Sequence, residues 1–247
     1  MRIALVNGHR SEAAPGLAGI CQVCQSPTIP KCGNLRAWHW AHQGKRVCDP
    51  WWEETEWHIA WKNRFPSDWQ EILHTGPNSE IHIADVKTPT NYVLEFQHSP
   101  ISELERQSRE AFYGSMVWVV DGLRRIRDRK SFTKTIHVKN RKPLVYSGFE
   151  DECALLRDWL GRPVDVVFDF GECKEDIATF GRPVLWQLHP DPQRQVLLTP
   201  IYTDAFIEML HKGGALQRLF YKPAPPPAVR IPLPPLLEHP RRRFRRF

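Results

Sequence analysis

Short apolar runs separated by turn residues dominate the stretch from residue 51 to residue 122, and their spacing changes from helical to strand-like along it. Apolar positions between Trp57 and Trp61 have helical spacing, and Pro66 ends that pattern. The runs that follow are short and rich in Ile, Val and Leu, as strands are. In order, the pattern predicts a helix over 51–65, strands over 69–74, 80–86 and 92–97, a helix over 101–113 capped by Ser102, and a buried strand over 116–120.

Outside this stretch the patterning is weaker, and the second half of the chain has no chemical motif. Residues 3–6 predict a short strand, and the charged run at 124–130 predicts an exposed segment. The other predicted elements are a helix over 149–160, strands over 164–170, 184–188 and 196–198, and a helix over 201–219. Three acids in this half, Asp165, Asp169 and Glu172, have no convergent spacing. The mixture of helices and strands predicts an α/β fold.

Basic charge is concentrated at the C-terminal end of the 247-residue chain. Residues 222–247 hold seven of the 34 Lys and Arg residues and one of the 28 Asp and Glu residues, so this tail carries the whole net charge of +6. Its eight prolines and its charge prevent it from building a core, and we expect it to be disordered or polyproline-like. Basic tails bind polyanions, and the alternative is a solubilising end.

The sequence contains no run of about 18 apolar residues that could span a bilayer. Residues 1–10 also lack the apolar stretch of a secretory signal. We therefore expect a cytoplasmic protein with no membrane partner. In that compartment the six cysteines are expected to be thiols or metal ligands rather than disulfides.

Cysteine and histidine gather between residues 21 and 48. Four of them form a CxxC pair and an HxxH pair: Cys21 with Cys24, and His39 with His42. Two thiolates and two imidazoles would complete the tetrahedral shell of a structural Zn2+ ion. Cys32 and Cys48 are rival ligands, and the alternative is a loop with free thiols and buried histidines. We predict a zinc-binding module over residues 1–50.

Two carboxylates lie on the predicted strands 80–86 and 92–97, which a short turn joins into a hairpin. Glu95 and Gln97 are two residues apart, so both side chains point to one face, and Asp85 could face Glu95 across the hairpin. Carboxylate and water oxygens are the ligands that Mg2+ prefers. The alternative is that Asp85 ends a strand and Glu95 is solvated.

Glu54, His58 and Lys62 form one polar stripe on the first predicted helix, because they are spaced four residues apart. Seven of the ten tryptophans lie between Trp38 and Trp69. The stripe therefore either lines a cleft with aromatic walls or is a solvent-facing ladder beside an aromatic core.

These pieces, in this order, resemble the competence protein CoiA-like nuclease family of the PD-(D/E)xK superfamily. The matching residues are the pairs Cys21–Cys24 and His39–His42, then Glu54, His58, Lys62, and the segments 84–86, 95–99 and 117–121. The resemblance covers about residues 20–122. It implies a restriction-endonuclease-like αβββαβ core over 51–122, in which Asp85 and Glu95 bind Mg2+ (or Mn2+). Residues 123–221 remain an α/β region of unknown role.

The family motif carries a lysine where this chain has Gln97, which can hydrogen-bond a water or a phosphate but brings no positive charge. Lys62 or Lys87 could supply that charge, and Lys62 is preferred because it lies on the helix stripe of the family. By the same resemblance, Glu54 adds a metal carboxylate or orients a ligand, and His58 contacts the scissile phosphate or holds Glu54. The tail would hold the phosphate backbone through Arg241, Arg242, Arg243, Arg245 and Arg246.

The resemblance thus implies a Mg2+-dependent nuclease that hydrolyses phosphodiester bonds of nucleic acid, with DNA as the expected substrate, in DNA uptake, recombination or defence. The zinc module would be a structural or DNA-contacting appendage. Two alternatives stay open. The replacement of the motif lysine by Gln97 also fits a catalytically inactive nucleic-acid-binding protein. The APPPAVRIPLPP segment also fits an adaptor that presents a polyproline helix to a protein partner.

Overall fold

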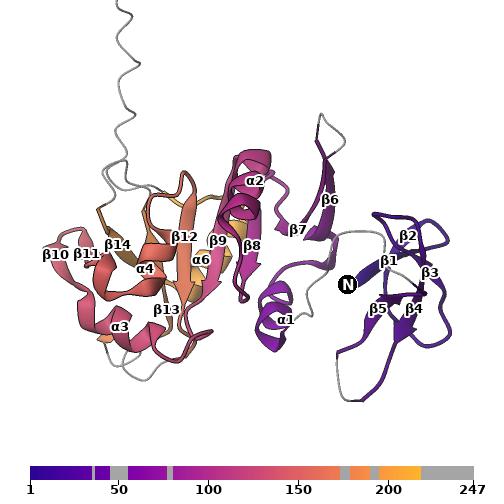
Figure 1. The fold of residues 1–247 in the computed structure, drawn as a ribbon, viewed down its shortest axis with the longest axis horizontal. Helices are drawn as coiled ribbons and strands as arrows, with labels where there is room; N and C mark the ends of the chain where they lie inside the picture. The colour runs from indigo at the N-terminus through magenta and orange to yellow at the C-terminus, as the bar shows by residue number, and fades with distance from the viewer. Residues whose placement is uncertain (35–36, 45–54, 77–79, 173–178, 190–194, 218–247) are drawn as a thin grey trace, which may run out of the picture.

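Two β-sheets organise the chain, a small one within residues 3–42 and a large one within residues 70–202 (Figure 1). The computed structural model describes residues 1–34, 37–44, 55–76, 80–172, 179–189 and 195–217.

The small sheet is entirely antiparallel. Its strands are β1 (Ile3–Val6), β2 (His9–Glu12), β3 (Gly19–Ile20), β4 (Pro27–Lys31) and β5 (His39–His42), in the order β2-β1-β3-β4-β5. Ala4, Ala13 and Trp40 form its buried centre. Gly19 permits the close packing there, because a Cβ at this position would lie 2.9 Å from Thr28 Oγ1. The structure confirms the predicted strand β1, whereas the other strands are short and mostly polar and were not predicted.

The predicted order of helix, strand, strand, strand, helix and strand is confirmed between residues 56 and 121. These elements are α1 (Glu56–Lys62), the 3-10 turn η1 (Ser67–Trp69), β6 (Gln70–Thr75), β7 (Ile81–Lys87), β8 (Val93–Gln97), α2 (Glu103–Tyr113) and β9 (Met116–Asp121). Thr55 caps α1, and Ser102, the predicted cap, accepts a hydrogen bond from the Glu105 amide in α2. The helical connection through α2 places β8 and β9 side by side and parallel.

The second half of the chain extends the same sheet. It supplies α3 (Asp128–Thr135), β10 (His137–Arg141), β11 (Leu144–Ser147), η2 (Glu150–Glu152), α4 (Ala154–Trp159), β12 (Asp165–Asp169), β13 (Val184–Leu188), β14 (Leu198–Tyr202) and α6 (Thr203–His211). Because β12 pairs in parallel with β9, the strand order is β10-β11-β14-β13-β12-β9-β8-β7-β6. Residues 51–122 and 123–221, which the sequence predicts as separate regions, therefore share one sheet.

Several elements of this half differ from their predictions. The helix predicted over 149–160 is divided into η2 and α4, and the helix predicted over 201–219 is limited to α6. The strand predicted over 196–198 lies further along the chain, as β14. The charged run at 124–130 is not wholly exposed, because Asp128 begins α3 and is buried beside Arg125. The β10–β11 hairpin was not predicted, since β10 is polar and fully exposed.

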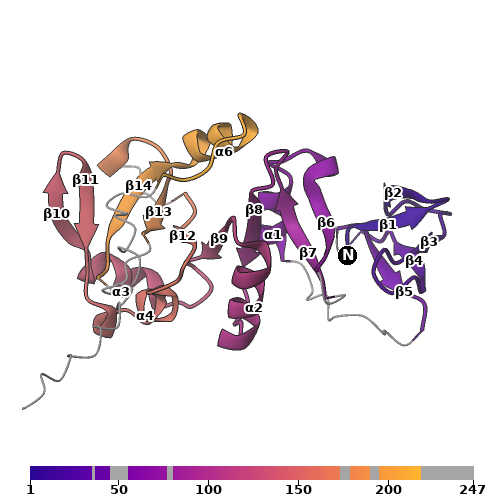
Figure 2. The same cartoon turned by 90° about the horizontal axis from the view of Figure 1, so that it is seen from above.

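Two apolar clusters cover the two faces of the large sheet. Neighbouring residues of β9 point into opposite clusters, with Val119 in one and Trp118 in the other. Helices α1 and α6 pack on the Val119 side through Trp61 and Phe206, and α4 packs on the Trp118 side through Trp159. Figure 2 shows α6 on one side of the sheet and α3 and α4 on the other. The strand β9 is thus central and buried, as the sequence predicts.

Some predictions fall outside the described ranges. They concern the helix residue Glu54, the rival ligand Cys48, the tail over 222–247, and its arginines, Arg241, Arg242, Arg243, Arg245 and Arg246. Among the residues that the structure does describe, no helix is long and apolar enough to cross a membrane.

Candidate active site and candidate metal centre

The strands β7 and β8 pair over only two positions, and the predicted carboxylates lie where the pairing ends. Val86 pairs with Leu94, and the next residue on each strand is Asp85 or Glu95. At this point the side chain of Asp85 replaces a backbone acceptor, because its Oδ2 accepts a hydrogen bond of 2.9 Å from the Phe96 amide. The two acids therefore lie at the same opening in the sheet.

Lys62, the last residue of α1, reaches this opening from the helix side. Its Nζ lies 3.3 Å from Asp85 Oδ1 and 3.2 Å from Glu71 Oε1. The lysine side chain is 1% exposed, whereas that of Asp85 is 22% exposed. Of the two lysines that the sequence offers, Lys62 is the one that the described structure pairs with Asp85; it places no ion pair between Lys87 and that carboxylate.

Glu71 in β6 is a site residue that the sequence analysis missed. Its buried carboxylate accepts hydrogen bonds from the backbone amides of Arg2 and Ile3, each at 2.9 Å, in addition to the contact with Lys62. Its backbone is in the left-handed region, with φ of 49°. No sequence signal marks it, because a single acid in a short strand is ordinary, and its partners are distant in the chain.

Glu95 is almost completely buried and faces α2. Its Oε2 accepts a hydrogen bond of 2.8 Å from Arg109, while its Oε1 has no hydrogen-bond partner in the described structure. The Tyr113 hydroxyl lies close to this carboxyl group and favours its ionised form. Burial raises the pKa of Glu95 to about 8, with the charge of Asp85 adding to the rise and Arg109 opposing it. Arg109 and Tyr113 were not predicted, although their four-residue spacing places them on one face of α2.

The raised pKa of Glu95 gives a pH prediction for the metal-free protein. Between its ordinary value of 4.5 and about 8, the folded chain holds a proton that the unfolded chain releases. Folding therefore takes up a proton in this window, so the stabilising contribution of this group is complete below about pH 4.5 and is lost as pH rises to about 8. We expect the Tm of the wild type to fall more between pH 5 and pH 8 than that of Glu95→Gln, whose amide does not titrate. Melting curves in chelator measure this difference, and parallel pH profiles of the two proteins would contradict it.

His58 and Gln97 both have hydrogen bonds to backbone carbonyls. His58 Nε2 bonds to the Phe96 carbonyl, which places the ring beside the strand of Glu95. The Gln97 amide donates to the carbonyl of Ser99 rather than to either carboxylate. The described structure thus brings His58, Lys62, Asp85 and Glu95 to one place, with Gln97 further along β8.

A separate candidate metal centre lies where the turn between β3 and β4 meets β5. The ligand atoms of Cys21, Cys24 and His42 all lie within 4.8 Å of one another, with Cys24 Sγ 3.3 Å from His42 Nε2. They form the only group of three or more potential ligands among the residues that the structure describes. Two thiolates and an imidazole match the ligands that Zn2+ takes in structural sites. The group can therefore hold a metal ion.

His39 is not part of this group, which corrects its prediction as a ligand. HxxH brings two histidines together on a helix, but residues 39–42 form strand β5. Side chains three apart on a strand point to opposite faces, and about 10 Å separates their positions. His39 Nδ1 instead lies 2.9 Å from the Ala37 carbonyl. The rival ligand Cys32 packs against the Ala4–Trp40 cluster.

This geometry predicts different zinc contents for the two histidine variants. His42→Ala should lower the bound zinc well below one ion per chain, because it removes an inner ligand. His39→Ala should keep the wild-type content. Metal analysis of the purified proteins measures both, with Cys21→Ser as a positive control for loss. Equal zinc loss in His39→Ala and His42→Ala would restore His39 as a ligand.

A second polar group occupies the carboxyl ends of the parallel strands β9 and β12. Asp169 Oδ2 accepts hydrogen bonds from the indole N–H groups of Trp57, at 2.9 Å, and Trp61, at 2.8 Å. Its register partner Asp121 lies 2.6 Å from His98 Nδ1. Asp169, which the sequence shows only as a scattered acid, therefore fixes α1 to β12.

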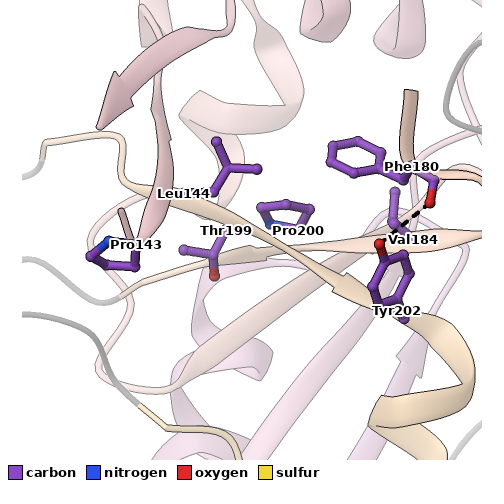
Figure 3. Close-up of a pocket in the computed structure, with 7 residues that line it drawn as sticks. All are labelled: Pro143, Leu144, Phe180, Val184, Thr199, Pro200 and Tyr202. Atoms are coloured by element: carbon purple, nitrogen blue, oxygen red, sulfur yellow. Dashed lines mark hydrogen bonds between the residues drawn. The ribbon is translucent and has the colours of Figure 1, made fainter. Parts of the chain in front are cut away.

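An apolar cavity lies elsewhere in the large sheet. It has a volume of about 340 Å³ and is lined mainly by apolar side chains of the β10–β11 hairpin, β13 and β14 (Figure 3). Tyr202 closes one end, and its hydroxyl donates to the Phe180 carbonyl at 3.3 Å. Strands β12 and β9 separate β13 from β8, so this cavity contains none of the predicted site residues.

No protein-family model, no curated protein and no solved structure matches this chain. The function is therefore inferred from the geometry of the two sites.

Proposed function

We propose that the protein is a Mg2+-dependent nuclease that hydrolyses phosphodiester bonds, with DNA as its substrate. The observation that carries this proposal is the contact of 3.3 Å between Lys62 Nζ and Asp85 Oδ1 at the opening beside Glu95. The chain lacks the lysine of the family motif, and α1 brings a substitute ammonium group to the same carboxylate.

The residues present fit a divalent cation at this opening. Asp85 is partly exposed, and Glu95 Oε1 is a buried acceptor without a hydrogen bond, so each offers an oxygen atom. When bound, Mg2+ or Mn2+ would supply an activated water and neutralise charge on the phosphate. Lys62 would add a fixed positive charge in a site that is largely shielded from water. His58, anchored to the Phe96 carbonyl, would contact the phosphate from the α1 side.

The fold supports the same proposal. The order α1, β6, β7, β8, α2, β9 agrees with the αβββαβ core expected for the PD-(D/E)xK superfamily, and this order supports the restriction-endonuclease-like fold that we propose. The acids lie on the second and third strands of this core. DNA uptake, recombination and defence are the processes in which such an enzyme would act.

Incubation of the purified protein with supercoiled plasmid tests the activity. We expect relaxed or linear product at about 5 mM Mg2+. This concentration is above the dissociation constant expected for a weak site with two carboxylates. Excess chelator should prevent the product from forming. Single-stranded DNA and RNA belong in the same panel, because they identify the substrate class. Intact substrates across the panel, with a folded and zinc-loaded protein, would reject the nuclease.

One alternative has its own structural support. Arg109 pairs with Glu95, and the Gln97 amide is bound to the Ser99 carbonyl. If Glu95 stays paired with Arg109 and Gln97 stays bound to Ser99, the site fits a nucleic-acid-binding protein without catalysis. DNA binding that persists in the absence of any cleavage would favour this alternative over the nuclease.

The basic tail gives a prediction on binding. Removing residues 222–247 deletes seven Lys and Arg residues, whereas the rest of the chain is neutral. We expect weaker DNA binding and a flatter salt dependence, because each lost phosphate contact lowers the slope by about 0.9. Binding titrations at several salt concentrations measure the slope. Cleavage at saturating protein should survive, and its loss would place the tail in the active site.

A further inference from the structure

We infer that the Cys21–Cys24–His42 centre positions Lys62 beside Asp85, acting through Gln22 and Glu71. This inference rests on the role proposed for Lys62. It assigns the metal module a task beyond that of an appendage, and it makes Gln22 and Glu71 positioning residues.

The first link starts inside the CxxC turn. Gln22 lies between the two cysteine ligands and is buried, and its side-chain amide donates to the Glu71 carbonyl at 3.2 Å. The turn itself is closed by hydrogen bonds of the Cys21 amide to Ser26 and of the Gln25 amide to Cys21. A metal ion on the two cysteines would fix this turn and thereby the direction of the Gln22 side chain.

The second link is the backbone of Glu71. A non-glycine residue at φ of 49° is strained unless its surroundings hold it. Two side chains from the small sheet hold its carbonyl, Gln22 and Arg10, with Arg10 at 3.3 Å. Arg10 also donates to the neighbouring carbonyl of Gln70. The conformation of Glu71 thus depends on the small sheet being folded.

The third link is the buried carboxylate of Glu71. It shares its charge between two backbone amides of the small sheet, those of Arg2 and Ile3, and the ammonium group of Lys62. If the small sheet loosens, the two amides are lost, and Lys62 becomes the main compensation for a buried charge. The ammonium group is then drawn toward Glu71 and away from Asp85. With the amides in place, Lys62 can lie between the two acids, as observed.

Amide hydrogen exchange tests this chain of contacts without any measurement of cleavage. The Phe96 amide reports on Asp85, because it donates to Asp85 Oδ2, and the Ile3 amide reports on Glu71. Removing the metal from the full chain with a chelator should speed exchange at both amides by at least about tenfold. Gln22→Ala should give the same direction of change while it keeps its zinc. Val23→Ala, in the same turn, is the control and should leave both rates unchanged.

The outcomes separate this inference from the nuclease proposal. Faster exchange at the Ile3 amide with unchanged exchange at the Phe96 amide, both on chelation and in Gln22→Ala, would overturn the inference. The effect of the metal centre would then reach Glu71 but not Asp85. If Gln22→Ala loses its zinc, Arg10→Ala decides, since it removes the other donor to the Glu71 carbonyl from β2, outside the metal group. Coupled exchange in a protein that cleaves no substrate would reject the nuclease and keep the inference.

Discussion

Asp85→Asn is expected to reduce Mg2+-dependent cleavage at least about a hundredfold, the scale of losing one charge-stabilising group from an active site. The amide keeps the shape of the side chain and can still accept the hydrogen bond from the Phe96 amide. It cannot contribute negative charge to a cation or to the pair with Lys62. Initial rates on plasmid over a range of Mg2+ concentrations measure the effect, together with a melting curve for folding.

Two further variants show whether the loss of cleavage is specific to the carboxylates of the site. Glu95→Gln removes the second carboxylate and should cause a loss of similar size. Glu152→Gln removes an exposed acid in η2 and should keep the wild-type rate, so it controls for the change of one charge. Asp85→Asn with full activity is the result that rejects the nuclease assignment as a whole.

Lys62→Ala should lower the cleavage rate by about a hundredfold or more, whereas Lys87→Ala should have a smaller effect. The difference follows from position, because Lys62 contacts Asp85 from within the protein and Lys87 lies at the end of β7. Each variant removes one positive charge, so the two proteins differ in the position of the lost lysine and not in net charge. Rates at saturating substrate compare the two lysines directly.

Folding must be controlled in this comparison. Removing one partner of a buried ion pair typically costs about 3–5 kcal/mol, and Lys62→Ala leaves the buried Glu71 without its cation. Lys62→Met keeps more of the apolar packing of the side chain and should be equally inactive. If either variant is folded and active while Lys87→Ala is inactive, Lys87 is the substitute for the motif lysine.

The order of elements from α1 to β9 could be predicted because it depends on local patterns. Helical spacing before Pro66, a capping serine at Ser102 and an unbroken apolar run from Met116 each mark one element without reference to the rest of the chain. Asp85 could be related to Glu95 for the same reason, since a hairpin joins residues that are near in sequence. Lys62 is preferred to Lys87 through the resemblance to the nuclease family, whose helix carries the same stripe, and its contact with Asp85 agrees with that choice.

What could not be predicted depends on residues far apart in the chain. Glu71 is held in the site by the backbone amides of Arg2 and Ile3, which lie almost 70 residues earlier in the chain. The HxxH pair predicts two neighbouring ligands, but pairing with β4 makes residues 39–42 the strand β5, whose extended backbone holds the two histidines apart. The parallel pairing of β9 with β12 likewise joins two halves that have different patterns in the sequence.

The two hydrogen bonds from the indoles of α1 to Asp169 have a consequence for synthesis of the protein. Helix α1 emerges from the ribosome about 110 residues before its anchor, which takes several seconds at the usual rate of about 5–20 residues per second. Strand β9 waits for its neighbour β12 over less than half of that interval, because the paired residues Asp121 and Asp169 are 48 positions apart. Until residue 169 has been translated, the two hydrogen bonds that fix α1 to β12 cannot form. A nascent chain that already carries every proposed catalytic group therefore still lacks this anchor of α1, and a premature stop codon before residue 169 would release a fragment without it.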